Sequence, residues 1–157
     1  MPIRVEVVAA ERQILDEEFD EVLARTPGGQ IGILPRHAPL LTTLVPGEVV
    51  LRRGGEDAIL AVGGGFMEVD HNHVVILADS AERAEEIDVA RAEEARRRAL
   101  ERLASRAPEI DQERAQAALA RALARLRAVE RLHRSGRRPQ RPLPAGVSES
   151  GLPPQAP

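Results

Sequence analysis

The side chains best suited to chemistry in this sequence are four arginines: Arg91, Arg98, Arg121 and Arg125. At about 100° per residue, the first two fall on one flank of an alanine stripe, and the other two lie a turn apart beside a second stripe. If both segments are helices that close on each other, the two flanks face one another. Four cations gathered there repel unless an anion lies among them, and guanidinium groups hold a triphosphate through forked hydrogen bonds. The spacing therefore predicts an anion site.

Three other groups have simpler explanations than chemistry. The glycines at residues 63–65 lack the Lys-Ser/Thr and the following helix of a P-loop, so a bulge or a close backbone contact is favoured. Asp70, His71 and His73 lie in a predicted turn without a further matching metal ligand. His37 has no Ser or Cys nucleophile constellation around it. We therefore predict no catalytic residue and no metal site.

The charge of the chain changes sign near Ile87. Residues 1–86 contain 7 Arg against 16 Asp and Glu, a formal charge of −9, whereas residues 87–157 contain 15 Arg against 9 acids, a formal charge of +6. The basic half is expected to seek an acidic partner. Because the chain has no Trp or Tyr and only two Phe, few rings are present for bases to stack on, and we predict no nucleic-acid partner.

Apolar runs in this sequence are short. None approaches the ~18 residues needed to span a bilayer, and the first residues lack the apolar stretch of a secretory signal. The absence of Cys excludes thiolate chemistry and agrees with a reducing compartment. We expect the chain to reach a membrane only through a partner.

The acidic half has the pattern of short β-strands. Ile3, Val5 and Val7 alternate with Arg4 and Glu6, which is typical of a strand with one buried face. Further strands are predicted at residues 13–15, 21–25, 32–34, 48–52, 58–62, 66–69 and 74–78, with Gly, Pro, Asn and Asp at the turns between them. Many short strands without an intervening helical pattern predict an antiparallel β-sandwich over residues 1–86.

Residues 87–134 are predicted to form an antiparallel two-helix hairpin. Asp88 and Asp111 suit the N-caps of the two helices, and Pro108 ends the first. The apolar stripes are mostly alanine: Ala92, Ala95, Ala99 and Leu103, then Ala115, Ala118, Ala122, Leu126 and Val129. Burying a methyl group contributes about 0.8 kcal/mol, against ~1.5–3 kcal/mol for a Leu side chain, so the docked hairpin is expected to be weakly held and able to open.

The last segment, residues 135–157, contains 6 prolines and few apolar residues, and it is predicted to be a disordered Pro/Arg-rich tail. The predicted fold class is thus β + α, with three parts at residues 1–86, 87–134 and 135–157.

Several segments together resemble the epsilon subunit of F-type (bacterial) ATP synthases. Residues 28–41 (GGQIGILPRHAPLL) are similar to the family's hallmark segment, and residues 46–49 (PGEV), 64–69 (GGFMEV) and 75–82 (VILADSAE) follow in the family's order and spacing. The resemblance covers residues 1 to about 134, and the proline-rich tail departs from the family's usual length. The family's fold, a β-sandwich followed by two helices, agrees with the periodicity.

The resemblance implies a non-catalytic rotor subunit in the central stalk, which couples proton flow to ATP synthesis. Its implied partners are the gamma subunit, the c-subunit ring and the alpha/beta catalytic hexamer, which places it peripherally on the cytoplasmic side of the cell membrane. The helical part is implied to inhibit ATP hydrolysis when it extends into the hexamer. No cofactor is required, although ATP is implied as a regulatory ligand. The alternative is a free-standing adaptor or nucleotide sensor of the same architecture.

Residues 87–92 (IDVARA) resemble the motif of those epsilon subunits that bind ATP. The resemblance implies that Ile87, Asp88, Arg91 and Ala92 belong to a nucleotide site, with Glu82 as the site carboxylate. The helical spacing adds Arg98, Arg121 and Arg125 to this predicted site. The simpler alternative is an ordinary helix start, with Asp88 as N-cap, Ile87 packed on the sandwich and Arg91 in solvent.

A second set of arginines, Arg127, Arg131 and Arg134, is predicted on the outer face of the second helix, where Glu130 partly balances it. A solvated face is the simpler interpretation. In the family, basic residues of this helix meet an acidic loop of the catalytic beta subunit in the extended state, and we favour this partner interpretation.

Overall fold

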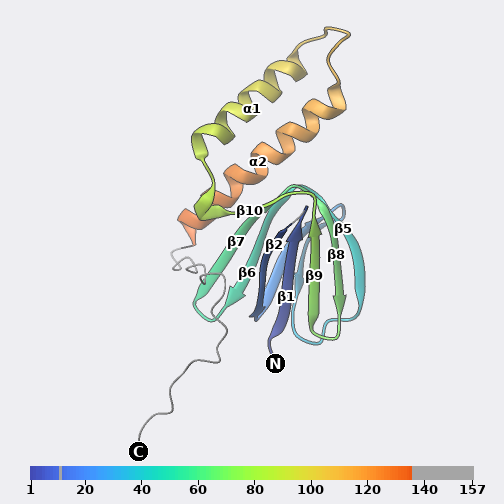
Figure 1. The fold of residues 1–157 in the computed structure, drawn as a ribbon, viewed down its shortest axis with the longest axis vertical. Helices are drawn as coiled ribbons and strands as arrows, with labels where there is room; N and C mark the ends of the chain where they lie inside the picture. The colour runs from blue at the N-terminus through green and yellow to red at the C-terminus, as the bar shows by residue number, and fades with distance from the viewer. Residues whose placement is uncertain (11, 136–157) are drawn as a thin grey trace, which may run out of the picture.

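The computed structural model describes residues 1–10 and 12–135, and it consists of a β-sandwich that carries a helical hairpin (Figure 1). The predicted tail lies outside the described residues apart from Ser135. Both sheets have five strands. The predicted fold class, a sandwich followed by two antiparallel helices, is confirmed.

The first sheet has the strand order β2-β1-β9-β8-β5. Its strands are β1 (Ile3–Ala9), β2 (Arg12–Phe19), β5 (Leu40–Leu44), β8 (Gly65–Asp70) and β9 (His73–Ala78). All neighbours are antiparallel except β1 and β9, which pair in parallel with Val5 opposite Val74 and Val7 opposite Ile76. The predicted antiparallel sandwich therefore contains one parallel pair.

The second sheet has the strand order β10-β7-β6-β3-β4, with every pair antiparallel. Its strands are β3 (Glu21–Thr26), β4 (Gly29–Ile33), β6 (Gly47–Arg53), β7 (Glu56–Val62) and β10 (Ala81–Arg83). The core between the two sheets is apolar, and its largest fully buried side chains include Phe19, Leu51, Leu60, Met67 and Ile76.

Strands β5 and β10 were not among the predicted strands, and the structure corrects this. The β5 sequence LLTTL lacks a strict alternation, and β10 is three residues long with a single apolar residue, so neither has the two-residue period. β4 also begins three residues earlier than predicted, at Gly29.

The hairpin follows a short 3-10 helix, η1 (Ala84–Glu86), and consists of α1 (Val89–Ala104) and α2 (Gln112–Arg134). Asp88 and Asp111 are the N-caps: their side chains accept hydrogen bonds from the backbone N–H of Arg91 and Arg114, both at 3.1 Å. α1 ends at Ala104, four residues before Pro108. Pro108 therefore lies in the turn between the helices and does not itself end α1.

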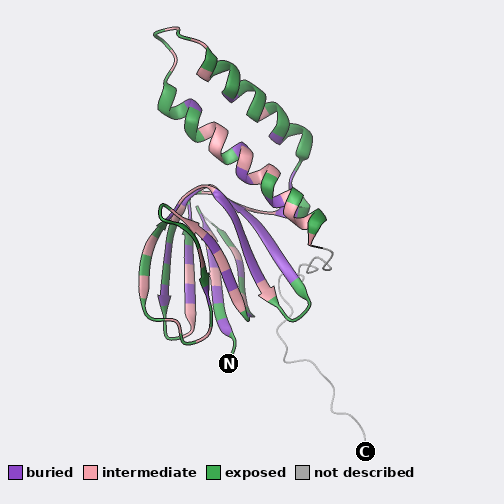
Figure 2. Cartoon of the chain, turned by 180° about the vertical axis from the view of Figure 1, so that it is seen from behind, coloured by how far each residue is buried: buried purple, intermediate pink, exposed green. Residues whose placement is uncertain are grey.

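The hairpin docks on the second sheet mainly through α2, while α1 packs on α2 (Figures 1 and 2). Val50 and Ile59 on the outer faces of β6 and β7 form a small apolar cluster with Ile87, Ala92 and Ala128. As a result β6 and β7 are buried on both faces over most of their length. None of the described helices is long and apolar enough to cross a membrane.

Candidate functional site

Seven of the eight residues predicted to bind nucleotide line one cavity of about 250 Å³. They come from β10, the linker after η1, α1 and α2: Glu82, Ile87, Asp88, Arg91, Ala92, Arg98 and Arg125. Ala95 of the α1 stripe also lines this cavity. We call it the hinge cavity, because it surrounds the linker that joins the sandwich to the hairpin.

Arg121, the eighth residue, lines a neighbouring cavity of about 270 Å³. Gly63 and Ser80 from the sandwich form part of its wall, and Glu82 and Arg125 line both cavities. All four arginines that the spacing groups together thus lie around two adjoining cavities between the sandwich and the hairpin.

Glu82 and Arg125 form an ion pair across the interface between β10 and α2. Arg125 Nε donates to Glu82 Oε2 at 3.0 Å, and both side chains are partly exposed. The strand that carries Glu82 is the short β10, which pairs with β7 through Glu82 opposite Ala61. The sandwich therefore fixes the carboxylate while α2 supplies the cation.

Asp88 and Ile87 have structural contacts as well as positions in the cavity wall. The Asp88 carboxylate caps α1, and Ile87 is buried in the apolar cluster under α2. These contacts agree with the simpler interpretation of the motif as a helix start, and they also place Arg91, in the first turn of α1, beside the cavity.

Arg91 and Arg98 lie on exposed turns of α1. Arg98 Nη1 lies 3.9 Å from Glu94 Oε1, whereas Arg91 forms no ion pair with another described residue. The hinge cavity has three guanidinium groups and two carboxylates in its wall. Since one carboxylate already pairs with Arg125 and the other caps a helix, the Arg91 cation remains available to an anionic ligand, whereas Arg98 also lies near Glu94.

The glycines at 63–65 allow the backbone to approach closely beside these cavities. A Cβ on Gly63 would lie 2.1 Å from Ser80 Oγ, and the Gly63 N–H donates to the Ser80 carbonyl at 2.8 Å. Gly65 has φ of 136°, and a Cβ there would lie 2.0 Å from the Leu77 carbonyl oxygen. This geometry is a close backbone contact between strand ends, not a phosphate cradle.

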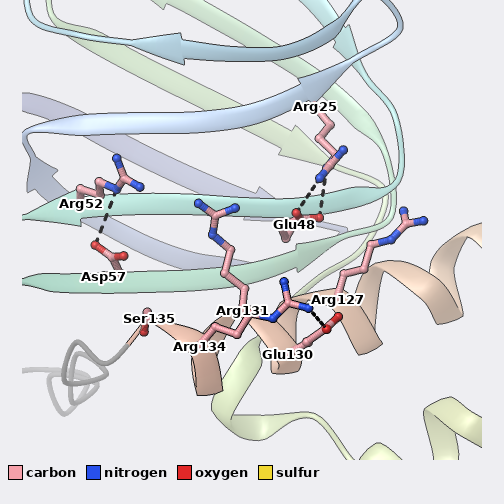
Figure 3. Close-up of a pocket in the computed structure, with 9 residues that line it drawn as sticks. All are labelled: Arg25, Glu48, Arg52, Asp57, Arg127, Glu130, Arg131, Arg134 and Ser135. Carbon is pink, nitrogen blue, oxygen red and sulfur yellow. Dashed lines mark hydrogen bonds and ion pairs between the residues drawn. The ribbon is translucent and has the colours of Figure 1, made fainter.

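The arginines predicted on the outer face of α2 lie beside the second sheet in this conformation. Arg127, Arg131 and Arg134 line a cavity of about 510 Å³ between the C-terminal part of α2 and strands β3, β6 and β7 (Figure 3). We call it the sheet cavity. Its walls are thus partly formed by the strands, so this face of α2 is not the fully solvated surface of the simpler interpretation.

Glu48 is one of two buried carboxylates of the sheet cavity, at 8% exposure, and the other is Asp57. Burial raises the pKa of the Glu48 carboxyl, but hydrogen bonds from Arg25 and from its own backbone, with the charges of Arg25 and Arg131, outweigh burial and lower it overall. The two hydrogen bonds from Arg25, at 2.7 and 3.1 Å, form a fork. Glu48 was not among the predicted site residues, although a lone acid inside the apolar strand GEVVL was a signal.

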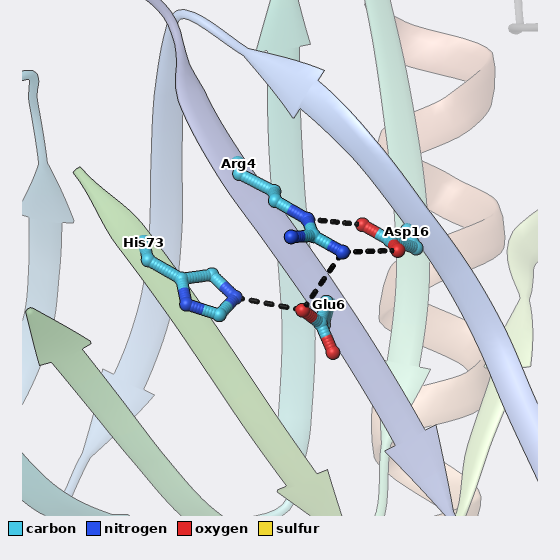
Figure 4. Close-up of polar contacts among 4 residues, drawn as sticks. All are labelled: Arg4, Glu6, Asp16 and His73. Carbon is cyan, nitrogen blue, oxygen red and sulfur yellow. Dashed lines mark hydrogen bonds and ion pairs between the residues drawn. The ribbon is translucent and has the colours of Figure 1, made fainter.

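A second polar network lies on the outer face of the first sheet (Figure 4). Arg4 forks onto Asp16 at 2.8 and 2.9 Å, and its Nη2 also lies 3.3 Å from Glu6, which contacts His73 at 2.8 Å. The hydrogen bond from Arg4 is the main cause that lowers the pKa of the Asp16 carboxyl. His71 faces Asp70 instead, so the two histidines have different partners.

Two family models match consecutive parts of the chain. The ATP synthase delta/epsilon chain β-sandwich domain matches residues 2–84, and the delta/epsilon chain long α-helix domain matches residues 85–130. The ATP synthase epsilon chain of Chloroflexus aurantiacus is 57% identical over 96 residues, which cover 61% of this chain and 69% of that protein. The epsilon chain of Herpetosiphon aurantiacus is 57% identical over 99 residues, covering 63% and 73%.

Solved structures share the fold. A chain in the mitochondrial ATP synthase of Euglena gracilis, solved with OSCP, F1 and the c-ring, aligns with a TM-score of 0.73 and 24% identity over 82% of this chain and 81% of that chain. A chain in the central stalk and c-ring of the Tetrahymena thermophila enzyme aligns with a TM-score of 0.54 and 15% identity, over 81% and 96%. With both domains matched in order, this chain belongs to the ATP synthase delta/epsilon family, as an epsilon subunit of F-type ATP synthase.

Proposed function

We propose that this chain is a non-catalytic central-stalk subunit that couples proton flow to ATP synthesis, and that its hairpin regulates ATP hydrolysis by moving between docked and extended positions. The observation that carries the regulatory part is the hinge cavity. Its walls come from β10, the linker, α1 and α2. Extension of the hairpin separates these elements, so the cavity exists only in the docked state.

The docked state is held by a small interface, as a reversible switch requires. Val50, Ile59 and Ala61 of the sheet meet a helix whose one fully buried residue in the cluster is Ala128, with Leu126, Val129 and Leu132 partly buried beside it. Alanine contributes little apolar area, about 0.8 kcal/mol per methyl. A ligand that binds only this state shifts the equilibrium toward it in proportion to its concentration and affinity.

ATP is the proposed regulatory ligand of the hinge cavity. Arg91, Arg98 and Arg125 offer forked donors to the phosphates, and Glu82 offers an acceptor to a base amino group or a ribose hydroxyl. Neither cavity alone reaches the ~300 Å³ at which small-molecule sites begin, so a nucleotide spans both, and Arg121 joins the site from the second. Low ATP then releases the hairpin.

In the extended state, the sheet cavity opens and Arg127, Arg131 and Arg134 leave the sheet. They are then free to meet an acidic loop of the catalytic beta subunit, as the family resemblance implies. The docked state withholds the same three cations, so docking and inhibition exclude each other.

The outer face of the first sheet supports docking on the gamma subunit. Phe66 and Leu77 lie opposite each other on β8 and β9 and are 53% and 55% exposed, and Val8 continues the row onto β1. Such a row of exposed apolar side chains is typical of a protein interface. Through gamma and the c-ring the chain sits peripherally on the cytoplasmic side of the cell membrane.

Equilibrium dialysis of the full chain against ATP tests the regulatory proposal. We expect saturable binding below millimolar ATP, and about tenfold weaker binding in Arg98→Gln because one charged fork is lost. Arg102→Gln is the matched control, since it removes one α1 guanidinium outside both cavities. Absence of saturable binding up to millimolar ATP would overturn the proposal.

A further inference from the structure

The sheet cavity is a second cationic site in the docked conformation, separate from the hinge cavity in its lining residues. The described residues of its wall include five arginines and three carboxylates, a formal charge of +2. The two cavities have no lining residue in common. The sheet cavity is also the larger, at about 510 Å³.

Three of the five arginines are already neutralised. Arg25 forks onto Glu48, and Arg134 contacts Glu130. Arg52 donates to Glu21 at 3.0 Å from the far side of its guanidinium and lies 3.9 Å from Asp57 through Nε. The excess positive charge therefore belongs to the remaining two arginines.

Arg127 and Arg131 form no ion pair with another residue in the described part of the chain, although the charge of Arg131 acts on Glu48. Figure 3 shows the Arg131 side chain reaching from α2 toward β6, between Arg52 and Glu48. The Arg131 side chain thus lies over the sheet without an ion-pair partner among the described residues.

A hydrogen-bond donor is also left over in the wall. The Nε atom of Arg52 is buried and has no hydrogen-bond partner among the described residues. A buried donor without an acceptor is energetically unfavourable. The same cavity thus holds two uncompensated cations and one uncompensated donor.

We propose that the sheet cavity binds a phosphate dianion, held between Arg131 and Arg127 of α2 and Arg52 of β6. A phosphate carries about −1.5 to −2 charges and several acceptor oxygens, which matches the excess of two positive charges and accepts forked hydrogen bonds. The two cavities are lined by different residues, so anion binding at each can be tested separately.

The bound phosphate bridges α2 and the second sheet, because its donors come from both. It therefore favours the docked hairpin. This consequence, unlike the site itself, rests on the proposed function: phosphate would then occupy Arg131 and withhold it from a partner in the extended state.

Isothermal titration calorimetry of the full chain with inorganic phosphate, at ionic strength held constant with chloride, tests the site. Saturable binding is expected in the unmodified chain, with at least about tenfold weaker affinity in Arg131→Gln. Arg102→Gln is the matched control and should bind as the unmodified chain does. A parallel titration with AMP distinguishes the sources: equal affinity indicates free phosphate, and tighter AMP binding indicates the phosphoryl group of a nucleotide.

Several outcomes would overturn the proposal. These are no saturable phosphate binding, binding that Arg98→Gln abolishes while Arg131→Gln does not, and Arg131-dependent binding only to an acidic peptide. Because Arg98 lies in the hinge cavity alone, a failed ATP site and a failed phosphate site give different results. If Arg131→Gln does not fold, arginine Nε–H NMR signals of the unmodified chain decide: those of Arg52 and Arg131 should shift with phosphate, and unshifted signals contradict the site.

Discussion

Arg125 of α2 donates to Glu82 of β10 at 3.0 Å, so one ion pair joins the two domains and forms the common wall of two cavities. The residues are 43 positions apart in sequence. Their side chains are 39% and 35% exposed, so the pair acts as a positioning contact more than as a source of stability.

Glu82→Gln should loosen the docked hairpin slightly, by up to about 1 kcal/mol, because a partly exposed ion pair contributes no more than that. The measurement is the rate of proteolysis within the hairpin. The double variant Glu82→Gln/Arg125→Gln should be proteolysed little faster than Glu82→Gln alone, because the single substitution already breaks the ion pair. Glu85→Gln, on the exposed η1, is the control; equal acceleration by Glu85→Gln would show that only net charge matters.

Ala128→Leu should displace α2 from the sheet. Ala128 is fully buried against β6 and β7, and overpacking such a position costs typically 1–3 kcal/mol. We expect faster proteolysis within the hairpin and an unchanged sandwich. Hydrogen exchange of the β1 and β9 amides reports on the stability of the sandwich. Ala117→Leu adds the same side chain on an exposed position of α2 and should have no effect. If both variants behaved alike, α2 would not be docked through Ala128.

Acid should weaken the sandwich through Asp16. Arg4 holds the pKa of the folded Asp16 carboxyl below its unfolded value of about 3.9. The stabilisation is therefore present above the unfolded pKa and is lost as pH falls through the folded pKa. Asp16→Asn should flatten the acid limb of unfolding midpoints measured against pH. Asp70→Asn, at the exposed last residue of β8, is the control; an acid limb as steep in Asp16→Asn as in the unmodified chain contradicts this role.

Reversing Arg127, Arg131 and Arg134 to Glu should raise ATP hydrolysis by the assembled enzyme, because the extended helix then repels the acidic loop of the beta subunit. The comparison is the hydrolysis rate of complexes that contain either chain at low ATP. Reversing Arg96, Arg97 and Arg102 on α1 makes the same charge change away from the sheet cavity. Equal rates in the unmodified and the α2-reversed complexes would count against the partner contact.

Phe66→Asp should abolish co-purification with the gamma subunit, because it places a charge in the exposed apolar row with Leu77 and Val8. The side chain is exposed, so the sandwich should stay folded by circular dichroism. Leu100→Asp, on the exposed side of α1, is the control. A chain that co-purifies with none of the synthase subunits even without substitution would favour the free-standing adaptor instead.

The sequence predicts those elements whose periodicity is local. The alternation of Ile3, Val5 and Val7 is enough to locate β1, and Asp88 and Asp111 are enough to locate both helix starts. β10 has no such pattern, because its place depends on pairing with β7. The parallel pairing of β1 with β9 is likewise a property of the whole sheet.

The same distinction applies to the sites. Helical geometry brings Arg91 and Arg98 to one flank, and the structure places them in one cavity with Arg125. Predicting the sheet cavity requires knowledge of how α2 docks on the second sheet, because that docking brings Arg131 close to Glu48 and Arg52. No spacing within one segment of sequence encodes that approach.

The parallel pair of β1 and β9 also orders events during synthesis. The first sheet cannot be completed until residue 78 has left the ribosome, since β9 is its central strand between β1 and β8. Such non-local pairing forms slowly, whereas two adjacent helices form from local contacts. We therefore expect the helical hairpin to form faster than the sandwich on which it docks, and the pairing of β1 with β9 to limit the folding rate of the chain.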